Sequence, residues 1–99
     1  MINRIVLLNL NDRANPSVMA AMQAYVSRIG AELAETRAYH LTRNEAADDG
    51  GYNWVLHSVF ADEADMNAYR EAPLHREFVE FCDPFTEDYR IVWYQGPPT

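Results

Sequence analysis

The sequence predicts an α+β fold in which one antiparallel sheet of four strands carries its helices on a single face. Three observations support this prediction. The chain has 99 residues, which suits one domain with one hydrophobic core. Its apolar residues recur every two residues in some segments and every three to four in others, the spacings of strands and helices. These segments follow one another in the order strand, helix, strand, strand, helices, strand.

Four segments have the pattern of β-strands. Ile2–Leu10 is apolar at both odd and even positions, which indicates a strand covered on both faces. A second strand is expected over residues 36–43. Tyr52–Phe60 shows the clearest alternation, and Tyr89–Gln95 alternates again near the end of the chain. The polar segment 44–51, between the second and third strands, ends in Asp-Gly-Gly and is predicted to be a loop.

One amphipathic helix is predicted between the first two strands. Asn15 followed by Pro16 is a typical start, because the Asn side chain can cap a helix and proline suits its first turn. An apolar stripe then recurs at spacings of three and four, formed by Val18, Met22, Tyr25, Ile29 and Leu33. Since Leu33 keeps the phase of this stripe, we expect the helix to continue through Gly30.

Two further helices are predicted after the third strand. Asp62 is placed to cap the first of them, with Asp65 three residues later, and Pro73 ends it. The second opens at about Leu74 and carries aromatic residues at helical spacing, namely Phe78, Phe81 and Phe85. Together the elements give the split βαβ order of a ferredoxin-like domain.

The sheet face away from the helices, called here the open face, is expected to be apolar. By alternation it carries Ile5, Leu7, Val55 and Val59, with His57 among them. A 99-residue chain has no further element to cover this face, and patches of this kind usually mark interfaces. We therefore expect a two-fold homodimer whose sheets pack face to face. A monomer with a half-solvated sheet is the alternative.

Composition excludes several classes of function. The 8 basic residues are all arginine and 15 residues are acidic, which gives a net charge of −7. An acidic chain without a basic cluster is a poor nucleic-acid binder. Without lysine, neither lysine Schiff-base chemistry nor a lysine-bearing phosphate loop is available. The single cysteine, Cys82, cannot form an internal disulfide.

No apolar run of the sequence is long enough for a signal segment or a membrane span. A cytoplasmic protein without a membrane partner is therefore expected. We expect one domain over residues 1–95, followed by a disordered tail over residues 96–99.

No cofactor and no metal are expected. His40, His57 and His75 are far apart in the sequence and form no His-x-His pair. His40 is expected at the surface or the sheet edge. The acidic segment 62–65 could attract Mg²⁺, but acidic residues in a first helical turn are also what the helix dipole favours.

Several segments resemble the stress-responsive dimeric α+β barrel (Dabb) family, in particular its olivetolic acid cyclase-type members. Met1–Leu8 resembles the opening strand of that family, and Arg43-Asn44 resembles its strand-ending Gly-Arg-Asn. Asp62–Phe85 resembles its signature of a short helix, a His-Pro-x-His element and a further helix. The resemblance implies a dimeric ferredoxin-like barrel with a small-molecule pocket between the sheet and the helices of each protomer.

The resemblance also assigns roles to residues. A plant cyclase of the family closes a linear polyketide by aldol condensation, with a histidine base and a tyrosine partner, which match His75 and Tyr69. The chain departs from the family at three positions. Arg4 stands where members commonly carry a histidine, Trp54 where the cyclase carries another, and Ala72 at the first histidine of the His-Pro-x-His element. These departures concern the reaction rather than the fold.

The residues around His75 allow two interpretations. Phe78, Val79 and Cys82 follow it at helical spacing, so its side chain lies along an apolar stripe. Burial there penalises the charged form and leaves a neutral imidazole that can accept a proton. The alternative is a histidine that only packs at the helix junction, with Tyr69 in the core.

Arg4 shares a strand face with Val6 and Leu8 that should look toward the helices. Its permanent charge there requires either a carboxylate of the protein or a ligand anion, and we favour a pair with an acidic residue at the barrel rim. The predicted pocket lining, which could equally be plain core, comprises Arg4, Val6, Leu8, Trp54, Leu56, Phe78, Phe81, Phe85 and Ile91.

Three functions are consistent with the sequence. The first is a dimeric barrel that binds a small apolar or aromatic molecule, extended by a polyketide cyclase-like or lyase-like activity with His75 as base. The second is a non-catalytic, stress-associated dimer whose pocket region is filled core. The third is a cofactor-free oxygenase of the related antibiotic-biosynthesis monooxygenase group. A cavity of about a few hundred Å³ beside His75 would favour the first over the second.

Overall fold

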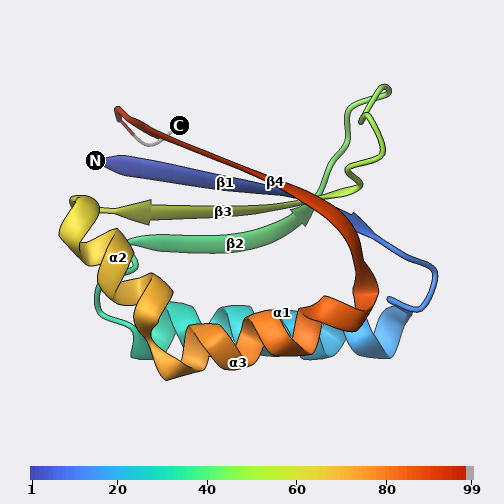
Figure 1. Ribbon diagram of the computed structural model, residues 1–99, viewed down its shortest axis with the longest axis horizontal. Coiled ribbons are helices and arrows are strands. Elements are labelled where there is room, and N and C mark those ends of the chain that lie inside the picture. Colours follow the sequence, from blue (N-terminus) through green and yellow to red (C-terminus); the bar gives the residue numbers. More distant parts are fainter. Residues whose placement is uncertain (98–99) are drawn as a thin grey trace.

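The computed structural model describes residues 1–97. All four strands pair in one antiparallel sheet in the order β2-β3-β1-β4, and Figure 1 shows the helices beneath one face of it. The predicted α+β, ferredoxin-like fold is thus confirmed. The elements in chain order are β1 (Ile2–Leu10), α1 (Pro16–Glu32), β2 (Ala38–Arg43), β3 (Trp54–Phe60), α2 (Glu63–Glu71), α3 (Pro73–Cys82), a 3₁₀ turn η1 (Asp83–Phe85) and β4 (Thr86–Gln95).

The helix starts follow from their caps. The Asn15 side chain accepts a hydrogen bond of 3.0 Å from the backbone N–H of Val18, and α1 continues through Gly30 as predicted. The Asp62 carboxylate accepts one of 2.9 Å from the N–H of Asp65 at the start of α2. Each cap satisfies an amide that has no partner within its own helix. Within residues 1–97, no helix has both the length and the apolar composition that crossing a membrane requires.

Some strand boundaries differ from the prediction. β3 begins at Trp54 rather than Tyr52, because the side chain of Asn53 takes the place of a backbone partner. Its amide accepts from the N–H of Leu10 at 2.9 Å and donates to the Leu10 carbonyl at 3.0 Å, and so extends the β1–β3 ladder by one step. β2 begins at Ala38, two residues later than expected, and β4 at Thr86, three residues earlier.

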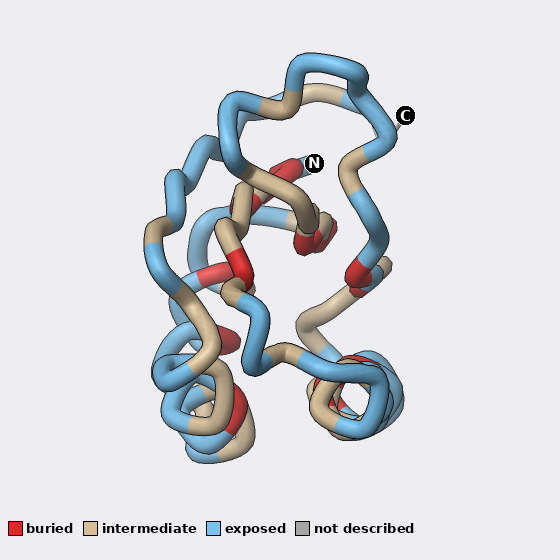
Figure 2. Tube along the Cα trace, turned by 90° about the vertical axis from the view of Figure 1, so that its right-hand side faces the viewer, coloured by how far each residue is buried: buried red, intermediate tan, exposed pale blue. Residues whose placement is uncertain are grey.

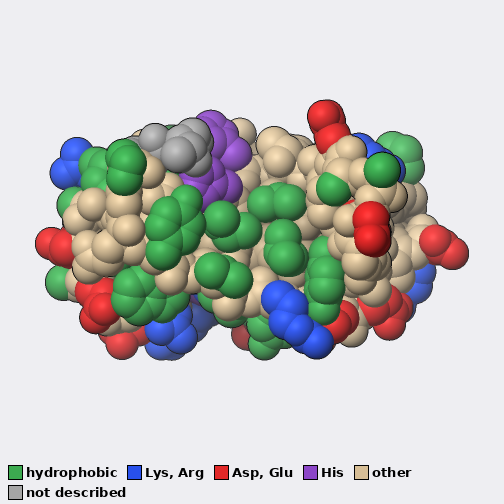
Figure 3. Space-filling view, turned by 90° about the horizontal axis from the view of Figure 1, so that it is seen from above, with side chains coloured by type: hydrophobic (Ala, Val, Ile, Leu, Met, Phe, Trp, Pro, Cys, Tyr) green, Lys and Arg blue, Asp and Glu red, His purple; other side chains and the backbone are tan. Residues whose placement is uncertain are grey.

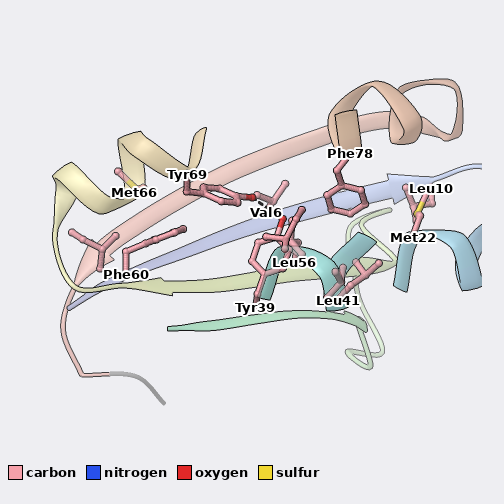
Figure 4. Packing of buried hydrophobic residues seen from close by; sticks show 13 residues of the cluster. Val6, Leu10, Met22, Tyr39, Leu41, Leu56, Phe60, Met66, Tyr69 and Phe78 are labelled. Carbon is pink, nitrogen blue, oxygen red and sulfur yellow. Dashed lines mark hydrogen bonds between the residues drawn. The ribbon is translucent and has the colours of Figure 1, made fainter. Parts of the chain in front are cut away.

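The core lies between the helices and one face of the sheet. The register places Val6 of β1 opposite Leu56 of β3 and Ile91 of β4, so these three side chains share the helix-facing side. Figure 2 looks along the two longer helices and shows buried residues turned toward the space between them and the sheet. Figure 4 shows how this cluster interlocks around residues such as Tyr69 and Phe78.

The open face is apolar, but its extent differs from the prediction. Ile5, Leu7 and Val55 are half-buried there, as expected for an uncovered sheet, and Figure 3 shows hydrophobic side chains across this surface. Val59 was expected in the same patch but is only 2% exposed. The Asn3 side chain beside it donates to the carbonyl oxygens of Gly96 and Pro97, which covers this end of the face. β4 adds Val92 and Tyr94, which are 52% and 40% exposed.

Two histidines meet on the open face. The β2–β3 register places His40 directly opposite His57, although they are well separated in the sequence. His57 also hydrogen-bonds Asn3 Oδ1 through Nε2 at 3.1 Å. These two histidines are therefore neighbours in space although they form no short sequence motif. Within residues 1–97, no three potential metal-ligating side chains come together.

The predicted tail begins in contact with the first strand. The N–H of Gly96 donates to the Met1 carbonyl at 2.9 Å, so the β1–β4 pairing ends with Met1 and Gly96 adjacent. Residues 98–99 of the predicted tail lie outside the described residues. The disordered tail and the domain boundary at residue 95 stay predictions.

Candidate functional site

A cavity of about 510 Å³ lies between the sheet and the α2–α3 pair. Its size is typical of sites that bind small organic molecules. Its floor comes from β1, β3 and β4, and its wall from the end of α2 and the inner face of α3. The lining residues are Arg4, Val6, Leu8, Leu56, Asn67, Arg70, Glu71, His75, Phe78, Val79, Cys82, Asp83, Thr86, Tyr89 and Ile91.

His75 lines this cavity from the first turn of α3. Pro73 interrupts the helix between α2 and α3. This interruption brings His75 close to the carbonyl of Arg70, which accepts a hydrogen bond from Nδ1 at 3.1 Å. Because a carbonyl oxygen only accepts, the proton of a neutral His75 is on Nδ1 and the lone pair is on Nε2. Burial lowers the pKa of His75, and the Arg4 and Arg70 charges lower it further. The imidazole is thus a free base at neutral pH.

Tyr69, the other predicted catalytic residue, does not line the cavity. It is fully buried, and its hydroxyl lies 2.7 Å from the hydroxyl of Tyr39, a contact drawn as a dashed line in Figure 4. Burial raises the pKa of both tyrosines, so both hydroxyls stay protonated. The Tyr69 ring is 4.3 Å from the His75 ring, centroid to centroid. Tyr69 therefore supports the imidazole from behind rather than facing the cavity.

Arg4 reaches the cavity from near the start of β1. It is only 6% exposed, and its guanidinium carbon lies 5.8 Å from the centre of the Tyr69 ring, within range of a cation–π contact. The ion pairs found in residues 1–97 join Arg28 to Glu32 and Arg90 to Asp88. The expected pair between Arg4 and an acidic rim residue is therefore not formed in this part of the chain.

The predicted lining is divided by the structure. Three of its aromatic residues pack elsewhere, and for Phe81 the reason is that helical spacing alone does not fix how α3 is rotated against α1. Phe81 contacts Tyr25 of α1 at a centroid distance of 5.4 Å, and Phe85 contacts Phe81. Trp54 lies at the start of β3 beneath the Arg43 guanidinium. The predicted residues that line the cavity are Arg4, Val6, Leu8, Leu56, Phe78, Ile91 and His75.

Several lining residues were missed. Val79 and Cys82 follow His75 on one helical stripe, and Tyr89 precedes Ile91 by two residues on β4, so periodicity was a usable signal for all three. The polar residues near the cavity mouth, such as Asn67 and Asp83, carry no such signal. Burial raises the pKa of the Cys82 thiol to about 12, so this side chain acts as a protonated, unreactive part of the wall.

A second hollow, of about 560 Å³, lies on the outer surface along α1 and α3. Its walls are mostly charged, exposed side chains, which give an apolar ligand little surface to bury. The cavity beside His75 is therefore the better candidate site. The outer hollow is lined by Arg28, Pro73, Leu74, Arg76, Glu77 and Glu80.

Sequence comparison places the chain in a family. Residues 2–95 match the family described as the Stress responsive A/B Barrel Domain, or Dabb. The chain belongs to the Dabb family. The match confirms the resemblance found in the opening strand and in the α2–α3 segment. No curated protein matches the sequence significantly.

Solved structures with the same fold include three that cover almost the whole chain. A protein from Arabidopsis thaliana is 15% identical, with a TM-score of 0.87, over 100% of this chain and 98% of that one. A hydroxynitrile lyase from Passiflora edulis is 16% identical, with a TM-score of 0.86, over 99% and 94%. A dimeric ferredoxin-like protein from Thermobifida fusca is 22% identical, with a TM-score of 0.80, over 94% and 88%. At these identities the likeness concerns the fold alone.

Proposed function

We propose that this Dabb protein is a homodimer that binds a small, mainly apolar molecule in the cavity of each protomer, and that His75 acts on it as a general base. The observation that carries the proposal is the position of His75 at the wall of a cavity of about 510 Å³, with its Nδ1 held by the Arg70 carbonyl so that Nε2 is left as the proton acceptor. A filled core at this place would have favoured the non-catalytic alternative. The cavity supports ligand binding instead.

The proposed chemistry is proton removal from a carbon or oxygen acid, as in cyclase-type and lyase-type reactions. The Arg70 carbonyl holds the imidazole in the tautomer that accepts a proton at Nε2. A positioned base of this kind contributes roughly 10²–10⁴-fold to a rate. The solved hydroxynitrile lyase shows that a protein named for lyase activity uses the same fold, which supports this reaction class for Dabb proteins in general terms.

The proposed dimer pairs the open faces of two sheets. Ile5, Leu7 and Val55 form the centre of the face, with His57 among them, and Val92 of β4 extends it. Similar structures described as dimeric support the assembly. The test is light scattering, which should report twice the 11.4 kDa mass of one chain. A folded particle of one chain in dilute neutral buffer would overturn the dimer.

The catalytic part is tested with His75→Gln, using Arg76→Gln on the same helix as the matched control. Both purified variants and the wild type are incubated with linear polyketide thioesters and with aromatic cyanohydrins, and product formation is followed. We expect His75→Gln to lose roughly 10²–10⁴-fold in rate and Arg76→Gln to match the wild type. Equal rates for His75→Gln and wild type would exclude the general base and leave a binding protein.

A further inference from the structure

Arg4 is the only charged side chain that is buried in residues 1–97. The other polar residues buried there, Asn3 and Ser58, are neutral and have hydrogen-bond partners. An arginine cannot shed its proton, so burial cannot be relieved by a shift to a neutral form. A buried charge is retained in a fold at a free-energy cost unless an opposite charge or a set of hydrogen bonds compensates it.

The protein itself offers Arg4 little compensation. No acidic side chain of the described residues lies within ion-pair distance of it. Its neighbours are Tyr69, through both the ring face and the hydroxyl, and the neutral His75, and none of these groups carries the negative charge that would balance the guanidinium as a carboxylate does. Arg4 nevertheless lines the cavity, so a ligand bound there lies next to it. The positive charge of Arg4 can therefore be balanced by a negatively charged ligand in the cavity.

We propose that Arg4 binds the carboxylate of an anionic ligand whose apolar body fills the rest of the cavity. The inference rests on the proposed function, because it names the class of molecule that this cavity takes. The planar guanidinium can donate two parallel hydrogen bonds to a carboxylate, the geometry that makes such pairs strong and selective. Beyond Arg4 the walls offer apolar surface from Val6, Leu56, Phe78 and Ile91.

Charges at the mouth of the cavity do not supply this selectivity. The positive charge of Arg70 is balanced there by the negative charges of Glu71 and Asp83, and all three side chains are exposed. The chain as a whole carries −7, so an anion gains no attraction at long range. Selection for a carboxylate therefore depends on contact with Arg4, where exclusion of water strengthens the interaction.

The proposal predicts a coupling between the two ends of the site. The positive charge of Arg4 contributes to the lowered pKa of His75. A carboxylate bound to Arg4 cancels that charge, so occupancy should raise the pKa of His75. If the ligand bound elsewhere in the cavity, or if Arg4 had a purely structural role, the pKa of His75 would stay unchanged on binding.

The experiment compares 2-naphthoate with its neutral analogue 2-naphthamide, which has the same shape. Binding to the wild type, Arg4→Gln, Arg4→Lys and the control Arg76→Gln, whose side chain lines the outer hollow and not the cavity, is measured by calorimetry at 0.15 M salt, and His75 is titrated by NMR. We expect the wild type to prefer naphthoate at least about tenfold. Arg4→Gln should lose the preference and keep its affinity for the amide, while Arg76→Gln should retain both. Naphthoate, but not naphthamide, should raise the pKa of His75.

The outcomes separate this inference from the proposed function. Equal affinity of the wild type for naphthoate and naphthamide would refute the role of Arg4 and leave the cavity a binding site for neutral molecules. Binding of neither compound would overturn both proposals. If Arg4→Gln fails to fold, Arg4→Lys decides, because it keeps the charge without the planar fork. An undiminished preference in Arg4→Lys would refute bidentate recognition.

Discussion

The buried contact between Tyr39 and Tyr69 allows a quantitative test of the packing around the site. Tyr69→Phe preserves the ring and removes the hydroxyl that lies 2.7 Å from that of Tyr39. Tyr39 is only 6% exposed, so its hydroxyl would be left without this partner and largely out of reach of water. A buried polar group deprived of its partner costs about 1–3 kcal/mol.

The two single substitutions should differ in size. In Tyr39→Phe the remaining Tyr69 hydroxyl still has the Arg4 guanidinium nearby, as the effect of Arg4 on its pKa indicates. We therefore expect a loss of about 1 kcal/mol in the free energy of unfolding for Tyr39→Phe and of about 2–3 kcal/mol for Tyr69→Phe. For a domain of this size, each 1 kcal/mol lowers Tm by roughly 4–8 °C.

The assay is urea unfolding of the wild type, both single variants and the double variant, followed by circular dichroism. The double variant leaves neither hydroxyl without a partner, so it should cost less than the two single losses added together, by about 1 kcal/mol or more. Additive losses, or single losses below about 0.3 kcal/mol, would refute the buried pair. The same variants test Tyr69 as a catalytic residue, since the supporting role predicts an unchanged pH dependence of the rate.

Three further predictions follow from burial and charge. The pKa of His75 lies below its ordinary value of about 6.5. Any reaction that uses His75 as a base should therefore keep its rate at pH 7, and the rate should decline only as the pH falls toward the lowered pKa, as a pH–rate profile would show. Cys82, Tyr39 and Tyr69 have raised pKa values in the folded state, so stability should be constant to about pH 9 and fall above it as first the thiol and then the two hydroxyls ionise in the unfolded chain, which urea midpoints at pH 8 to 11 can check. Ile29→Ala empties a fully buried position and should cost about 2–5 kcal/mol in urea unfolding, whereas Ala24→Gly on the exposed side of α1 should cost about 1 kcal/mol or less.

Local chemistry explains why the elements could be predicted. Asn15 and Asp62 specify helix starts because their side chains accept hydrogen bonds from backbone N–H groups three residues later, and Pro73 interrupts a helix, so these boundaries depend on no distant contact. Strand parity likewise placed Arg4 on the helix-facing side and His57 on the open face. A one-residue shift would have inverted every one of those assignments.

The site could be predicted only in part, because it depends on how elements are placed against each other. The partner of Tyr69 is Tyr39, 30 residues away on β2, and no spacing pattern links the two. The pairing of His40 with His57 is set by the β2–β3 register, which the intervening loop does not specify. Arg4 was expected to pair with an acidic residue on the general rule that buried charges are paired, and in residues 1–97 its environment departs from that rule.

The hydrogen bond that joins Gly96 to Met1 has a mechanical consequence. Since β1 and β4 run antiparallel with their outer ends adjacent, a pulling force applied between the two termini loads their shared ladder at one end. The hydrogen bonds would then break one after another, as in peeling, rather than all at once, as in shear. The fold should therefore open at low force along this edge, and β4 would leave the sheet while β2 and β3 still hold β1 and the helices.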